Sequence, residues 1–137
     1  MECRIVEHTA DIGIHVEADG ADELFEGAAA GMFSIITDTS AVADREATEV
    51  SLEAGDTEGL MFKWLNELLY LADSRNVLFS RFEVSGVEAG RLHATAYGEG
   101  FDPARHTMNS EVKAATYHDL AVGREGGVWT ATVIFDV

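Results

Sequence analysis

Apolar residues along the chain follow two different periods. Residues 12–18 and 48–53 alternate apolar with polar side chains, which is the period of a strand with one buried face. Residues 21–36 and 61–72 instead place apolar side chains at i, i+3, i+4, i+7, i+8 and i+11, along one face of a helix. Asp56 stands where an N-cap of the second helix is expected. The pattern therefore predicts two amphipathic helices, each preceded by a strand.

The remaining segments read as strands. Residues 4–7 begin the chain with a short strand, and strands are predicted after Asn76 at residues 78–84, 91–97, 112–122 and 128–135. Together the elements predict an α+β fold, with mixed or antiparallel sheets, two amphipathic helices packed on one side, and one compact domain over residues 1–137.

The last predicted strand is apolar on both faces, so we expect it at the centre of its sheet. This placement would put Asp136 and Val137 inside the body of the protein. Arg105 and His106, beside the single proline, are expected at a solvated corner.

Charge narrows the possible functions. The chain carries 25 Asp and Glu against 9 Lys and Arg, a formal net charge of -16. Lys and Arg make most phosphate contacts, so direct binding to nucleic acid or to an anionic membrane surface is not expected. An acidic surface with two lysines is also typical of proteins from a high-salt cytoplasm, where screening relieves self-repulsion. We therefore expect stability to depend on salt.

Several motifs are missing from the sequence, and their absence limits the expected cellular compartment and the expected chemistry. No apolar run approaches the roughly 20 residues of a membrane span, and the first residues do not resemble a signal peptide. Cys3 is the single cysteine, which excludes an internal disulfide and fits a cytoplasmic protein. Phosphate-binding glycine loops, nucleophile elbows and zinc-protease motifs are missing from the sequence.

Two aspartates stand at strand ends. Asp11 opens an apolar strand after His8, where it could bind a cation or cap a turn, and His8 alone is more typical of a structural histidine. Asp136 follows three apolar residues, and a buried carboxylate needs compensation. A hard cation that is also bound by Val137 oxygens would supply it, as would an ion pair with an arginine or Lys113.

Lys113 is the third candidate. It lies in residues 111–118, where alternation places it on one face with Tyr117 and places His118 on the other. A lysine in so acidic a chain could hold an anion or carboxylate, or form an ordinary cross-strand ion pair.

Four segments in order resemble one family, archease. They are Glu-His-Thr-Ala-Asp-Ile-Gly at residues 7–13, Trp-Leu-Asn-Glu-Leu-Leu-Tyr at 64–70, Glu-Val-Lys-Ala-Ala-Thr-Tyr-His at 111–118, and Val-Ile-Phe-Asp-Val at 133–137. The similarity covers essentially the whole chain.

The resemblance implies a non-enzymatic accessory factor of the GTP-dependent RNA ligase of tRNA splicing. That ligase joins a 2′,3′-cyclic phosphate or 3′-phosphate end to a 5′-hydroxyl end through a guanylylated histidine, and the factor promotes guanylylation and multiple turnover. The resemblance also implies a divalent metal, calcium in relatives with magnesium or manganese possible, at Asp11, Asp136 and Val137. It makes Lys113 functionally important, and we expect His8 and His118 beside it on the face toward the ligase.

The residues and the resemblance agree on one point. If the strand ends that carry Asp11 and Asp136 are neighbours, two carboxylates meet and need a cation or a proton between them. Two other functions stay open, a small metal-dependent phosphohydrolase that also uses His8 and His118, and a metal-free, chaperone-like interaction module. We expect a monomer or weak oligomer.

Overall fold

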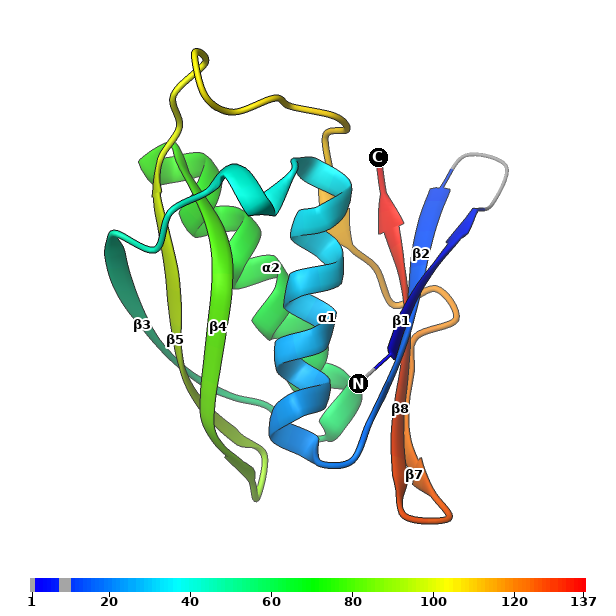
Figure 1. Cartoon of the computed structure of the whole chain (residues 1–137). Coiled ribbons are helices and arrows are strands. Elements are labelled where there is room, and N and C mark those ends of the chain that lie inside the picture. Colours follow the sequence, from blue (N-terminus) through cyan, green and yellow to red (C-terminus); the bar gives the residue numbers. More distant parts are fainter. Residues whose placement is uncertain (1, 8–10) are drawn as a thin grey trace.

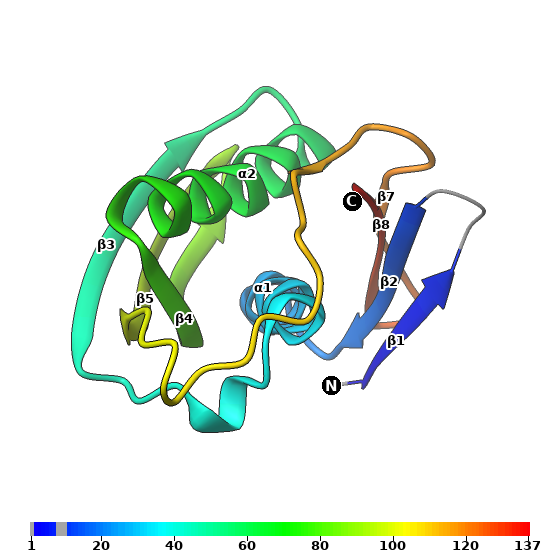
Figure 2. The same cartoon turned by 90° about the horizontal axis from the view of Figure 1, so that it is seen from above.

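The computed structural model describes residues 2–7 and 11–137 and contains two antiparallel sheets with two helices between them (Figures 1 and 2). In chain order the elements are β1 (Glu2–Glu7), β2 (Asp11–Ala18), α1 (Ala21–Ile36), a 3-10 turn (Thr39–Ala41), β3 (Glu46–Glu53), α2 (Thr57–Arg75), β4 (Val77–Glu88), β5 (Arg91–Gly100), β6 (Ala114–Ala115), β7 (Ala121–Glu125) and β8 (Val128–Asp136).

Two sheets cover the helices from opposite sides. One sheet has the order β1-β2-β8-β6 with β7 also paired to β8, and the other has the order β3-β5-β4. Each sheet turns one face toward α1 and α2 (Figure 2), which confirms the predicted α+β class and single compact domain. In the part of the chain that the structure describes, neither helix is long and apolar enough to cross a membrane.

The helices begin and end where local chemistry predicts. The Asp56 carboxylate caps α2 by accepting a hydrogen bond from the Gly59 N–H at 2.7 Å. At the other end of α2, Asn76 takes a left-handed φ of 54°, a conformation that asparagine tolerates at this position. The Trp64 indole N–H donates to the Phe25 carbonyl at 2.9 Å, which ties α2 to α1 within the core.

The core lies between the two sheets. It consists of fully buried aromatic and aliphatic side chains from both helices and both sheets. The largest are Trp64, Phe25, Phe33, Phe79, Phe135, Ile14, Leu24, Met32, Leu60, Met61, Leu65 and Leu68.

The predicted strand over residues 112–122 is wrong in its middle. It is divided into β6 and β7, because Asp119 adopts a left-handed φ of 53° and the Leu120 N–H donates to the Tyr117 carbonyl, which closes a turn. The Tyr117 ring stacks on Phe62 of α2, with ring centroids 4.1 Å apart. The chain therefore turns at residues 116–120 instead of continuing along the sheet.

The last strand is partly as predicted. β8 lies between β2 and the pair β6 and β7, so it is internal to its sheet. Its final residues are not inside the body, because Asp136 is exposed and Val137 is half-buried. The strand passes through the core and reaches the surface at one end of the molecule.

The predicted solvated corner is correct for Arg105, which is exposed, and wrong for His106. His106 is 4% exposed and Glu99 is 4% exposed, and the His106 Nε2 lies 2.9 Å from a Glu99 carboxylate oxygen. The Asp102 N–H donates to His106 Nδ1, so the proton lies on Nε2 and the imidazole donates it to Glu99. The segment after β5 is thereby fixed to the sheet.

Candidate functional site

Asp11 and Asp136 face each other across two antiparallel strands. β2 and β8 pair so that Asp11 is the register partner of Asp136, and Ile12 is the partner of Phe135. Directly opposite residues put their side chains on the same face, with Cβ atoms about 5 Å apart. The two carboxylates that the sequence separates widely are therefore neighbours, which we name the aspartate pair.

The aspartate pair lies at the end of the sheet, near solvent. Asp11 is half-buried and Asp136 is exposed. Along β2, Ile14 and Val16 face the core, so Asp11 and His15 belong to the opposite face. Figure 1 shows the start of β2 and the end of β8 at the same end of the molecule as the last turn of α1.

Lys113 approaches Asp136 through its main chain. The Lys113 N–H donates to the Asp136 carbonyl at 2.8 Å, and the next residue, Ala114, is the register partner of Asp136. Lys113 is exposed and lines a hollow of about 370 Å³ together with Tyr70 and Asp73 of α2. The main chain of Lys113 thus lies beside Asp136, while its side chain lines a hollow bounded by α2.

Of the two histidines predicted at the site, His8 and His118, the structure describes His118. His8 lies outside the described residues. His118 is exposed in the turn after β6, where its Nε2 lies 3.3 Å from an Asp119 carboxylate oxygen. Among the side chains that the structure describes, those of residues 2–5 and 11–137, no group of three His, Cys, Asp or Glu could hold a metal ion.

The donor atoms at the aspartate pair are all oxygens. Two carboxylates and the main-chain oxygens of Val137, the residue after Asp136, are hard ligands. Hard oxygen donors suit calcium, magnesium or manganese better than zinc or copper. The residues present therefore fit the class of ion that the family resemblance implies.

Sequence reasoning missed the role of Asn66. Its side-chain amide donates to the Ala115 carbonyl at 3.1 Å and accepts from the Ala115 N–H at 3.0 Å, in place of a neighbouring strand. Because Lys113 directly precedes β6, Asn66 fixes this segment beside Asp136. The one available signal was an asparagine directly beside the apolar stripe of a helix, where a half-buried polar group needs a partner.

A second polar cluster surrounds Glu99. The Ala43 N–H donates to its carboxylate at 2.8 Å, and the Arg105 guanidinium pairs with it, together with Arg45 at 3.4 Å and His106. The hydrogen bond from Ala43 and then that from Arg105 lower the pKa of Glu99 to about 2. The one signal of this cluster in the sequence was the alternation of glycine, acid and glycine at residues 98–100.

Comparisons with known proteins agree on one family. The model of the Archease protein family matches residues 4–137. A protein archease of Sulfurisphaera tokodaii is 40% identical over 132 residues, which cover 96% of this chain and 95% of that protein.

Two solved structures share the fold. The solution structure of protein 1598 of Methanobacterium thermoautotrophicum has a TM-score of 0.86 and 36% identity, covering 98% of each chain. The crystal structure of a Thermotoga maritima archease, described as a possible chaperone, has a TM-score of 0.65 and 28% identity, covering 96% of this chain and 94% of that one.

Proposed function

The chain belongs to the archease protein family, and we propose on this basis that it is an accessory factor of the GTP-dependent RNA ligase of tRNA splicing. In this proposal the protein promotes guanylylation and multiple turnover of the ligase. The ligase itself joins the 2′,3′-cyclic phosphate or 3′-phosphate end of one RNA to the 5′-hydroxyl of another. The chain contributes no catalytic nucleophile of its own.

The observation that carries this proposal is the aspartate pair. Two like charges at adjacent strand ends cost stability unless something compensates them, so such an arrangement favours a functional role over a structural one. The pair is accessible at one end of the molecule, where a partner protein can reach it. A repulsive, exposed pair is suited to a contact that is completed by another component.

We further propose that Asp11, Asp136 and the main-chain oxygens of Val137 hold a divalent cation, calcium or in its place magnesium or manganese. When bound, the ion neutralises the two carboxylates and offers positive charge to an anionic group. β2 and β8 hold the two aspartates rigidly, because both strands continue into the buried core at Ile14 and Val133.

Lys113 supplies a second positive charge, on the α2 side of the sheet end that carries the aspartate pair. Its main-chain hydrogen bond to Asp136 fixes its position along the chain, while its exposed ammonium is free to meet a phosphate or carboxylate of the ligase. The net charge of -16 suits a factor that contacts the protein and is repelled by the RNA.

Single-turnover guanylylation of a cognate ligase tests the proposal. Ligase and GTP are mixed at high salt with and without this protein, and formation of the ligase–GMP intermediate is followed in time. We expect the wild type to accelerate this step, Asp136→Ala to abolish the acceleration, and Asp19→Asn at the far end of β2 to retain it. Equal stimulation by wild type and Asp136→Ala would refute the assignment of the aspartate pair. Turnover of GTP by the purified protein alone would favour an enzyme instead.

A further inference from the structure

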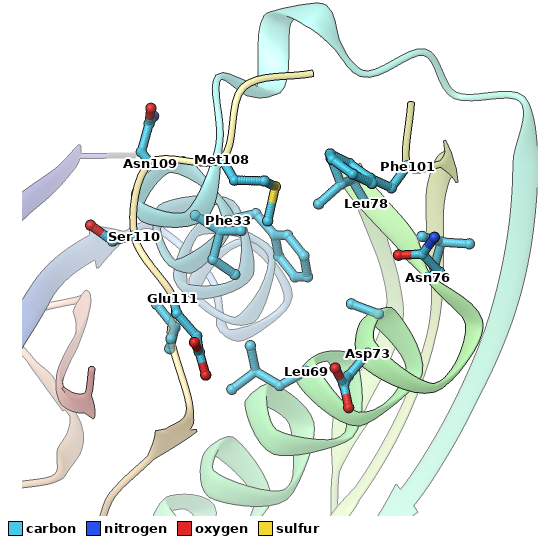
Figure 3. A pocket seen from close by; sticks show the side chains of 14 residues that line it. Phe33, Leu69, Asp73, Asn76, Leu78, Phe101, Met108, Asn109, Ser110 and Glu111 are labelled. Atoms are coloured by element: carbon cyan, nitrogen blue, oxygen red, sulfur yellow. The ribbon is translucent and has the colours of Figure 1, made fainter. Parts of the chain in front are cut away.

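A cavity of about 410 Å³ opens between the last turns of α1 and α2 (Figure 3). It is covered by the segment that connects β5 to β6, residues 101–113, which we name the strap. Phe33 of α1, Leu69 of α2 and Leu78 of β4 form its apolar wall. A cavity of this size is in the range of sites that accept a small ligand or one or two side chains.

The mouth of the cavity has an unusual apolar residue. Met108 of the strap is 51% exposed, and its side chain extends over Phe33 in Figure 3. Exposed methionine adapts its shape to a bound partner and is frequent at protein-binding surfaces. Phe33 beneath it is fully buried, so the floor of the cavity is rigid and its cover is adjustable.

Negative charge borders the same cavity. Asp73 of α2 and Glu111 of the strap place their carboxylates on the side where Leu69 lies (Figure 3). Neither carboxylate forms an ion pair with any residue that the structure describes. Both helices also end here, and a helix C-terminus carries partial negative charge. Lys113 lines the adjoining hollow with the same two carboxylates, so the three side chains together carry a net charge of about -1, which favours a cation with an apolar stem.

The cavity continues toward the aspartate pair. The hollow that Lys113 lines shares Leu69, Asp73 and Glu111 with it, and extends to Tyr70, which is 65% exposed. We name the cavity and this hollow together the strap groove. Because the Lys113 N–H bonds the Asp136 carbonyl, the groove reaches the main chain of the aspartate pair.

We propose that the strap groove receives a segment of the ligase in which an arginine or lysine is flanked by apolar side chains. This inference rests on the proposed function, because it takes the ligase as the partner. The aliphatic stem of the basic residue lies against Leu69 and Met108, and its charge meets Asp73 and Glu111. The groove supplies affinity, whereas the aspartate pair supplies stimulation.

Binding and stimulation are measured separately to test this division. The dissociation constant of the full chain for the ligase is determined by calorimetry, and guanylylation is measured at saturating protein. The double variant Asp73→Asn/Glu111→Gln removes both charges, and Met108→Ala removes the apolar cover. Matched controls are Glu88→Gln/Glu125→Gln and Val128→Ala, all exposed at the opposite end of the molecule.

We expect the double groove variant to bind the ligase about tenfold more weakly than its control, with an unchanged guanylylation rate at saturation. Met108→Ala should weaken binding by a factor of about three relative to Val128→Ala. Dissociation constants equal to those of the controls would overturn the groove proposal alone. The wild type could also bind the ligase without stimulating it. If the groove variants then bind more weakly than the wild type, the groove proposal is supported and the proposed function is refuted. A wild type that neither binds nor stimulates the ligase would refute both.

Discussion

Replacing Asp136 with asparagine should make the metal-free protein more stable while abolishing ligase stimulation. In wild type the register places the Asp11 and Asp136 carboxylates side by side at the end of β2 and β8. Asparagine keeps the size and the strand geometry of aspartate but removes one of the two charges. The variant therefore separates two effects of the aspartate pair, the loss of folding stability caused by charge repulsion and the proposed stimulation of the ligase.

The size of the effect follows from Coulomb's law. Two unit charges about 5 Å apart repel by about 0.8 kcal/mol in water and by about 3 kcal/mol at an effective dielectric constant of about 20. Asp136 is exposed, so screening by solvent favours the lower end of this range. We expect Asp136→Asn to unfold with a free energy about 1 kcal/mol higher than wild type in the presence of a chelator.

Calcium should reverse the order of stability. A cation that binds only the folded protein stabilises it by about 1.4 kcal/mol at ten times its dissociation constant. Wild type gains this stabilisation and Asp136→Asn does not. Urea denaturation with chelator and with calcium, at fixed ionic strength, measures both effects, and Asp19→Asn at the other end of β2 is the control. Equal stability of Asp136→Asn and wild type in chelator, together with equal gains from calcium, would refute the reasoning.

Three further predictions follow from other parts of the molecule. The low pKa of Glu99, about 2 against an ordinary 4.5, means that its contribution to stability is complete above pH 4.5 and is lost as the pH falls toward 2. The stability difference between wild type and Glu99→Gln should therefore shrink over that interval, and a difference independent of pH would contradict the proposed cluster. Asn66→Ala should cost about 2 kcal/mol in urea denaturation because both Ala115 hydrogen bonds are lost, and an unchanged free energy of unfolding would contradict this role of Asn66. The melting temperature should rise between low and molar KCl as salt screens the net charge of -16, and a constant melting temperature would remove the hypothesis of salt adaptation.

Local patterns predicted the helices and most strands because their causes are local. The bounds of α1 agree with the predicted residues 21–36, and the carboxylate of Asp56 caps α2 as expected. These features depend on side chains within a few positions of one another, so their spacing is visible in the sequence.

The errors occurred where distant segments decide the structure. The break in the predicted strand 112–122 occurs where Tyr117 stacks on Phe62 of α2, and β6 is held at its edge by Asn66 of the same helix, far earlier in the chain. Likewise, His106 is buried because its imidazole forms a hydrogen bond with the buried carboxylate of Glu99 on β5. A reading of neighbouring residues cannot anticipate such partners.

The aspartate pair was anticipated for a different reason. Alternation placed Asp11 at the start of one strand and Asp136 at the end of another, but their pairing in one register required the topology. The metal and the ligase remain predictions that the proposed experiments test, and the role of Lys113 remains a prediction.

The position of β8 has a consequence for how the protein acquires its shape during synthesis. β8 separates β2 from β6 and β7, yet it is made after every other element. Until residues 128–136 leave the ribosome, the β1–β2 hairpin has no inner neighbour, whereas the β3-β5-β4 sheet can already pair. Contacts between such distant segments form slowly, so insertion of β8 should be the late step of folding. A nascent chain therefore has no aspartate pair until that strand has closed the sheet.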